Sequence, residues 1–167
     1  MDLSVVNFKE TGEVGTKFSE ILQSARRHLD EIKAIPAISF SIAKAKLPTG
    51  PGIYVLYEGD QPIYVGRARD LRKRIRQHVN GTLSGSTFAF LLARNETKRQ
   101  ATYRPSGSRT DLLKNDTEFK SAFDQAIKKI LQMTVKFVEI EDDNLQYFFE
   151  FLCALEFETK HNKFRTT

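Results

Sequence analysis

The chain is poor in cysteine and has no long apolar run, and each absence excludes a class of protein. Cys153 is its single cysteine, which rules out an internal disulfide and a cysteine-based metal site and suits a reducing cytoplasm. No segment approaches the eighteen apolar residues of a membrane-spanning helix. The first residues, which include Asp2, Lys9 and Glu10, lack the charged-then-apolar order of a signal peptide. We therefore expect a soluble cytoplasmic protein with no membrane partner.

The length and the charge of the chain bound its architecture and its partners. At 167 residues, with 40% hydrophobic and 28% charged residues, the chain fits one globular domain with a single core. The net charge of +5 permits a polyanion such as nucleic acid as a partner. Many basic proteins bind no nucleic acid, so charge alone does not decide the function.

The first half of the chain changes from helical to strand-like hydrophobic spacing at residues 48–52. Residues 16–33 carry apolar side chains at helical spacing, and residues 36–47 form an irregular connector that begins at a proline. The Pro- and Gly-rich residues 48–52 break the chain. Residues 53–57 and 63–65 are then apolar, β-branched and aromatic, and the polar turn between them is short. This pattern predicts an antiparallel hairpin.

A helix is predicted directly after the hairpin. Asp70 is a suitable N-cap, and Leu71, Ile75 and Val79 form a stripe at i, i+4 and i+8. Gly81 supplies the end of the helix.

The second half reads as helices around one more strand. Residues 86–94 and 116–133 have helical apolar spacing, whereas residues 98–108 are polar and turn-rich and are expected to form a loop. Residues 134–140 alternate as a strand does, and a last helix begins after Asp142.

Two short motifs occupy the strands of the predicted hairpin. Gly52-Ile53-Tyr54 lies on the first strand and Tyr64-Val65-Gly66 on the second. Taken alone, Tyr54 and Tyr64 would be core tyrosines of a hairpin. Their order and spacing, followed by a basic link into a helix, resemble the GIY-YIG nuclease family, in which Val65 is a conservative replacement. The resemblance implies a small α+β domain, with a central, mostly antiparallel three-stranded sheet flanked by helices.

The resemblance also implies a domain organisation. It covers residues 46–164, so residues 46–167 are expected to form the nuclease-like domain. Between Gly81 and Met133 the chain is longer than a minimal domain of this kind, which predicts a helical insertion around residues 84–132. Residues 1–45 are expected to form a helical extension packed on the same domain.

Arg74 and His78 lie on the predicted helix that follows the second strand. On a helical wheel both fall at the border of the buried stripe, where a side chain is held by packing and still reaches a ligand. They are four residues apart and so lie on the same side of the helix, one turn from each other. Each alone would be an ordinary boundary residue. After the two strand motifs, the resemblance makes both of them catalytic, together with Tyr54 and Tyr64.

Glu150 and Asn162 complete the set that the resemblance implies. In the family an acidic residue on a helix binds one divalent metal, and an Asn follows it about twelve positions later; Glu150 and Asn162 have that separation. Glu156 is the competing carboxylate, but the chain ends before the twelfth residue beyond it. The chain departs from the family at Lys160 and His161, where relatives often carry Pro and an aromatic residue.

These residues define an expected reaction. The resemblance implies hydrolysis of a phosphodiester, with one Mg²⁺ or Mn²⁺ on Glu150, since hard carboxylate oxygen suits these ions. Arg74 and Arg67 would bind the phosphate through charge-assisted hydrogen bonds. Either Tyr54 or His78 would take the proton from the attacking water, and the sequence leaves this choice open.

A run of basic residues predicts where nucleic acid binds. Between positions 67 and 76 there are six basic residues against one acid, which is either a solvated helix face or a track for phosphates. The residues assigned to this surface, beside Arg74, are Arg67, Arg69, Arg72, Lys73 and Arg76.

Two functions of different class remain. The first is a metal-dependent endonuclease, a hydrolase acting most plausibly on double-stranded DNA, either alone or with a protein partner or as a homodimer. The second is a catalytically silent nucleic-acid-binding or assembly module that retains the fold. An intact set of catalytic residues favours the enzyme, because a binding module has no need of it.

Overall fold

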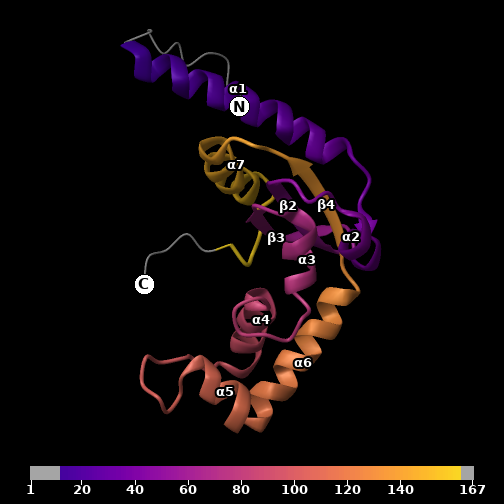
Figure 1. Ribbon diagram of the computed structural model, residues 1–167, viewed down its shortest axis with the longest axis vertical. Coiled ribbons are helices and arrows are strands. Elements are labelled where there is room, and N and C mark those ends of the chain that lie inside the picture. Colours follow the sequence, from indigo (N-terminus) through magenta and orange to yellow (C-terminus); the bar gives the residue numbers. More distant parts are fainter. Residues whose placement is uncertain (1–11, 163–167) are drawn as a thin grey trace.

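The computed structural model describes residues 12–162 as one curved molecule (Figure 1). Seven helices and four strands are assigned within this range, in the following chain order: α1 (Gly12–Ala34), β1 (Ile38–Ser39), α2 (Phe40–Lys46), β2 (Gly52–Glu58), β3 (Gln61–Ala68), α3 (Leu71–Gln77), α4 (Thr87–Thr97), α5 (Arg109–Asn115), α6 (Thr117–Leu131), β4 (Thr134–Glu139) and α7 (Asp143–Glu156). No helix within this part of the chain combines the length and apolar character that crossing a lipid bilayer requires.

The sheet is antiparallel throughout and has the strand order β1-β4-β2-β3. The predicted α+β class with a mostly antiparallel sheet is therefore confirmed, although the sheet has four strands where three were expected. The additional strand, β1, consists of Ile38 and Ser39 paired with Val135 and Thr134. Two residues are too few to show a period, so the sequence predicts only a connector at this position.

The hairpin of β2 and β3 carries both motifs in register. Tyr54 pairs with Gly66, and Leu56 pairs with Tyr64. A register shift follows Leu56, and Gly59 turns the chain with a φ of +59°. That left-handed conformation favours glycine because it has no Cβ. The two tyrosines therefore lie on neighbouring strands, as the hairpin prediction requires.

Side chains on β2 alternate between two apolar clusters, one on each face of the sheet. Tyr54 and Leu56 face a cluster that includes residues of α2, α3, α4 and α6. Ile53 and Val55 face the second cluster, which includes residues of α1 and α7. β2 is buried on both faces because helices cover both sides of the sheet, and only its last residue, Glu58, is exposed.

The chain outside the sheet extends in two directions (Figure 1). Helix α1 lies on α7, where Phe18 packs edge-on against Phe148 and Lys33 pairs with Glu156. Helices α4, α5 and α6 form a projection beyond α3, which we call the helical arm. α5 was not predicted, since its seven residues follow a polar segment. The division into residues 1–45 and 46–167 stays a prediction, and residues 1–11 and 163–167 lie outside the described part.

Candidate active site

Tyr54 and Tyr64 meet on one face of the hairpin. Tyr54 is fully buried, Tyr64 is half-buried, and their ring centroids are 6.3 Å apart. Burial raises the pKa of both hydroxyls, with the larger rise at Tyr54. The guanidinium of Arg74 opposes the rise at each tyrosine. Both tyrosines are therefore protonated at neutral pH.

Gly66 leaves the space that the Tyr54 ring fills. A Cβ built at position 66 would lie 2.2 Å from the Tyr54 hydroxyl oxygen and 2.3 Å from its Cζ. These distances are far below any real contact, and the buried Tyr54 ring has nowhere to move. Glycine is required here for close approach, and its φ is not positive. The motif glycine thus fixes the position of the first motif tyrosine.

Arg74 joins the hairpin to the helical arm. Its Nε donates to the Tyr54 hydroxyl at 3.4 Å. Its two terminal nitrogens donate to the Gly85 carbonyl at 3.3 Å and to the Thr87 hydroxyl at 3.0 Å. The guanidinium is therefore held by three oxygens, one on β2 and two at or just before the start of α4. A planar fork that is fixed in this way is suited to bind a phosphate oxygen without further ordering.

His78 lies behind Tyr54, with no exposed surface. Helix α3 ends at Gln77, so His78 caps it, and the Nε2 atom of His78 is 2.7 Å from the Tyr54 hydroxyl oxygen. Desolvation, reinforced by the charge of Arg74, lowers the pKa of His78 to about 3. The imidazole is therefore neutral, and its Nδ1 has no hydrogen-bond partner among the described residues. The His78 ring has no exposed surface, and the Tyr54 hydroxyl is its one hydrogen-bond partner within residues 12–162.

Burial of a neutral His78 predicts a destabilisation in acid. An unfolded histidine binds a proton below a pH of about 6.5, whereas folded His78 binds one only near pH 3, so the unfolded state gains protons between these values. The free energy of unfolding should thus fall by about 2 kcal/mol from this residue between pH 7 and pH 5. His78→Gln should remove that part of the pH dependence in urea unfolding experiments. Equal pH dependence in the two proteins would contradict the burial of a neutral ring.

Glu150 comes from α7 and faces the edge of β3. Its side chain is 24% exposed, and its carboxylate is 3.6 Å from the Arg67 Nε. Burial raises the pKa of Glu150, and the positive charges of Arg67 and Arg74 oppose this rise. Tyr147, one turn earlier on α7, lies under the Arg67 guanidinium at 3.3 Å from its ring centroid. Arg67 is thus fixed between an aromatic face and a carboxylate.

Glu156 has a different environment from Glu150. It is 45% exposed and accepts a hydrogen bond of 2.6 Å from Lys33 on α1. It therefore helps α1 to lie on α7 and takes no part in the group around Tyr54. This agrees with the choice of Glu150 over Glu156 that the sequence spacing suggests.

Asn162 binds the exposed edge of β3 through its side chain. Its Oδ1 accepts from the Val65 N–H at 2.8 Å, and its Nδ2 donates to the Val65 carbonyl at 2.8 Å. The Thr159 hydroxyl donates to the same Oδ1 at 2.9 Å. The amide thus takes the place of a neighbouring strand beside Tyr64. These bonds hold the edge of the hairpin, and the predicted catalytic role of Asn162 stays a prediction.

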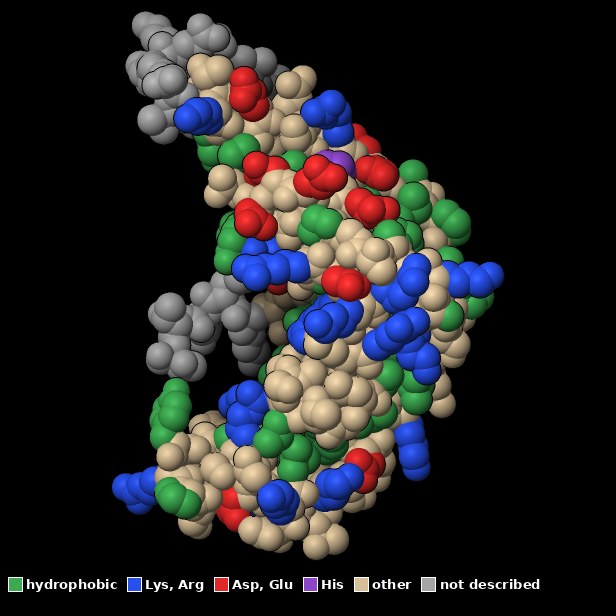
Figure 2. All heavy atoms as spheres, viewed as in Figure 1, with side chains coloured by type: hydrophobic (Ala, Val, Ile, Leu, Met, Phe, Trp, Pro, Cys, Tyr) green, Lys and Arg blue, Asp and Glu red, His purple; other side chains and the backbone are tan. Residues whose placement is uncertain are grey.

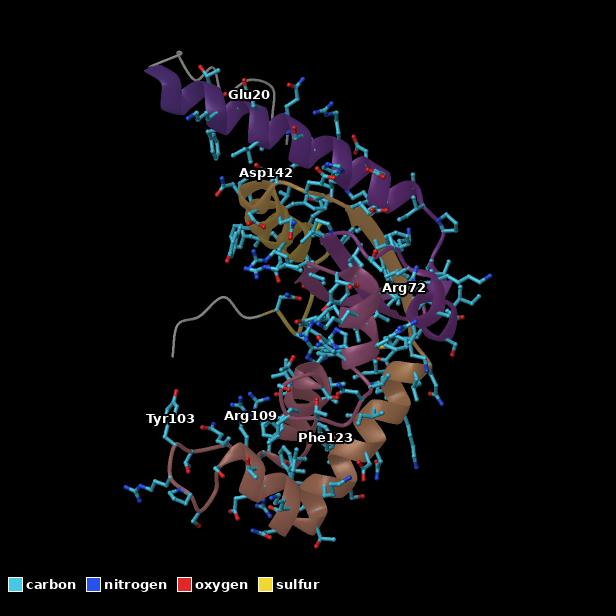
Figure 3. All side chains as sticks on the ribbon, in the orientation of Figure 1. Glu20, Arg72, Tyr103, Arg109, Phe123 and Asp142 are labelled. Atoms are coloured by element: carbon cyan, nitrogen blue, oxygen red, sulfur yellow. The ribbon has the colours of Figure 1, made fainter. Side chains whose placement is uncertain are left out.

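The five predicted DNA-binding residues lie in two groups. Arg67 and Arg69 line a small cleft beside Tyr147, near Glu150. Arg72 and Arg76 lie on the side of α3 away from Arg74, where their Nε atoms donate to the carbonyls of Leu47 and Lys44 in and after α2. With Lys73 they line a cleft of about 520 Å³. Figure 2 shows Lys and Arg side chains gathered over α2 and α3, and Figure 3 labels Arg72 there.

A divalent cation at this site would have one protein carboxylate. Residues 12–162 contain no group of three or more His, Cys, Asp or Glu side chains that could share a metal ion. Mg²⁺ often binds through one or two carboxylates and keeps several waters, so a single half-buried carboxylate fits it. Burial raises the pKa of Glu150, since its charged form loses hydration, and a bound cation would offset that cost.

Sequence reasoning missed three residues around the site. Phe88 of α4 stacks on Tyr64 with centroids 4.4 Å apart, Thr87 binds Arg74, and Tyr147 supports Arg67. Tyr147 could have been found, because it precedes Glu150 by three residues and shares its side of a helix. Thr87 and Phe88 carry no such signal, since only the tertiary fold brings α4 to the hairpin.

One segment of the chain matches a known family model. Residues 50–106 match the family model of the GIY-YIG catalytic domain, which is about a third of the chain. UvrABC system protein C of Deinococcus radiodurans is 42% identical over 57 residues, or 30% of this chain and 9% of that protein. The Aquifex aeolicus protein of the same name is 43% identical over 35 residues, or 21% of this chain and 6% of that protein. The chain thus spans less than a tenth of the length of these curated relatives.

Two solved structures of one domain are similar to this chain. The GIY-YIG N-terminal endonuclease domain of UvrC from Thermotoga maritima, in a point mutant bound to its catalytic divalent cation, aligns with a TM-score of 0.43 and 14% identity. The alignment covers 74% of this chain and 94% of that domain. The same domain bound to magnesium aligns with a TM-score of 0.40, covering 74% of this chain and 96% of the domain.

Proposed function

We propose that the chain is a divalent-metal-dependent endonuclease that hydrolyses phosphodiester bonds in DNA, because residues 50–106 match the GIY-YIG catalytic domain and the site geometry supports such chemistry. The observation that carries the proposal is the group of Tyr54, Arg74 and His78 in direct hydrogen-bond contact. Tyr64 lies against the Tyr54 ring, and burial raises the pKa of the half-buried Glu150 while the charges of Arg67 and Arg74 oppose that rise. A silent binding module would have no use for this arrangement.

Arg74 and Arg67 are the phosphate-binding residues of this proposal. Arg74 is already oriented by Tyr54, Gly85 and Thr87, and Arg67 by Tyr147 and Glu150. Guanidinium groups fixed in this way stabilise the negative charge that develops on the phosphate, with little reorganisation. Glu150 would hold Mg²⁺ or Mn²⁺, which as a Lewis acid would stabilise the leaving oxygen.

The buried pair of Tyr54 and His78 suggests how the proton of the attacking water is accepted. Tyr54 is protonated, and its hydroxyl oxygen lies 2.7 Å from the Nε2 of a neutral imidazole. Tyr54 and His78 are both kept as candidates for the base. The short hydrogen bond couples the two groups, and the lowered pKa of His78 opposes its taking a proton.

A cleavage assay decides between the enzyme and the silent module. The purified chain is incubated with an end-labelled duplex DNA and a matched RNA in Mg²⁺, in Mn²⁺ or in EDTA, and the products are separated on a denaturing gel. We expect DNA cleavage with either metal ion and none in EDTA. Binding of DNA without cleavage under all metal conditions would favour the silent module.

A further inference from the structure

The helical arm contains a second basic cleft, of about 220 Å³, between α4, α5 and the loop that joins them. Six residues line it: Thr87, Phe90, Leu91, Arg94, Ala101 and Arg109. Two of them are arginines and none is acidic. Figure 3 shows Arg109 at the start of α5, on the side of the arm that faces α4.

The two arginines lack acidic partners but differ in how firmly they are held. Arg109 donates from Nη2 to the Leu83 carbonyl at 3.1 Å, and its guanidinium lies 4.6 Å from the Phe90 ring centroid. Arg94 is exposed. Neither forms an ion pair within residues 12–162, whereas nearby Arg99 is paired with Asp116 and Glu118. Two uncompensated guanidiniums at one cleft favour an anionic ligand.

Thr87 links this cleft to the candidate active site. Its side chain lines the cleft, and its hydroxyl accepts the hydrogen bond of 3.0 Å from Arg74 Nη2. A strand whose phosphate contacts Arg74 therefore has the cleft next to it. Leu91, Ala101 and the Phe90 ring give the cleft an apolar part, which suits the sugar that adjoins a backbone phosphate.

We propose that this cleft, which we call the arm cleft, binds a backbone phosphate of the substrate strand beside the phosphate that is cut. The inference rests on the proposed function, because it takes the ligand to be the same nucleic-acid strand. Arg94 and Arg109 bind the phosphate, and the apolar residues contact its sugar. The helical arm thereby lengthens the binding surface beyond the hairpin, through contacts that do not depend on base sequence.

The test compares Arg94→Gln, Arg109→Gln and the double variant with a charge-matched control, Lys114→Gln/Lys128→Gln. The control lysines are exposed and do not line the arm cleft. Affinity for a fluorescent 30-base-pair duplex is measured in EDTA at several salt concentrations. The double variant should bind roughly three- to tenfold more weakly, and its log-log salt slope should be smaller by about 0.9, the value for one lost phosphate contact.

Several outcomes would overturn the inference. If the double variant and the control have equal affinity and equal salt slope, the arm cleft does not contact DNA. Inorganic phosphate could also raise the melting temperature of the wild type but not of the double variant, while both bind DNA equally well. That result would show that the arm cleft binds a free anion and not the substrate strand. Arg109→Gln also removes a hydrogen bond to the Leu83 carbonyl, so melting temperatures are measured for every variant. Arg94→Gln removes no hydrogen bond or ion pair within residues 12–162, so it must show part of the effect.

The inference and the proposed function fail in different ways. If the wild type binds DNA and never cuts it, while the double variant binds more weakly with a reduced slope, the arm cleft stands and the nuclease proposal falls. If the wild type cuts DNA and the double variant binds like the control, the nuclease proposal stands and the arm cleft falls.

Discussion

Glu150→Gln is expected to lower metal-dependent cleavage by a hundredfold or more, on the order of the loss seen when a key electrostatic group is removed. Glutamine keeps the size and hydrogen-bonding capacity of the side chain but lacks the charge that would hold a divalent cation. Burial raises the pKa of Glu150, because the charged carboxylate loses hydration in the folded protein. The variant should therefore melt no lower than wild type, and its DNA affinity in EDTA should be largely retained.

Glu156→Gln is the matched control for that measurement. Glu156 lies on the same helix, but it pairs with Lys33 of α1 and is not part of the group around Tyr54. Its replacement should leave the cleavage rate within about twofold of wild type, since an exposed ion pair contributes little. A protein that depends on Glu156 and tolerates Glu150→Gln would show that the metal ligand has been misassigned.

Arg74→Ala is expected to abolish cleavage and to lower stability as well. The change removes the phosphate-binding guanidinium and its bonds to Tyr54, Gly85 and Thr87. Loss of these bonds should cost about 1–3 kcal/mol of unfolding free energy, in line with partly buried hydrogen bonds to a charged group. Single-turnover rates and urea unfolding curves measure the two effects separately.

Arg74→Lys separates charge from geometry at the same position. Lysine keeps the positive charge but cannot reproduce a planar fork that binds several oxygens. We expect it to recover much of the DNA affinity lost in Arg74→Ala and only a small part of the cleavage rate. Full cleavage activity in Arg74→Lys would mean that the position supplies charge alone.

The sequence was sufficient for the elements that carry a long pattern. The hairpin, the helix that holds Arg74 and the helix that holds Glu150 all follow from hydrophobic period and turn residues. The spacing of the two motifs then predicts correctly that Tyr54 and Tyr64 share one hairpin. These features are local, or depend on a short turn, so one sequence contains the information.

The remaining features depend on contacts between distant segments. β1 forms because Ile38 pairs with Val135 of β4, and α4 packs on the hairpin through the contact of Phe88 with Tyr64. The basic run predicts Arg72 and Arg76 as DNA-binding residues, and both donate to carbonyls of α2 or of the residue after it. A helical wheel gives the direction of a side chain but not the segment that it contacts, so these two hydrogen bonds could not be predicted. The role of Arg72 and Arg76 in DNA binding stays a prediction.

The most direct measurement of the central claim is the rate of DNA cleavage as a function of Mg²⁺ concentration, for wild type and Glu150→Gln prepared in parallel. DNA is bound first in the absence of metal, and the reaction is started by adding Mg²⁺. The account predicts a saturating dependence on Mg²⁺ for wild type and a rate at least about a hundredfold lower for Glu150→Gln at every concentration. Equal rates for the two proteins, or cleavage by wild type that persists in EDTA, would contradict it.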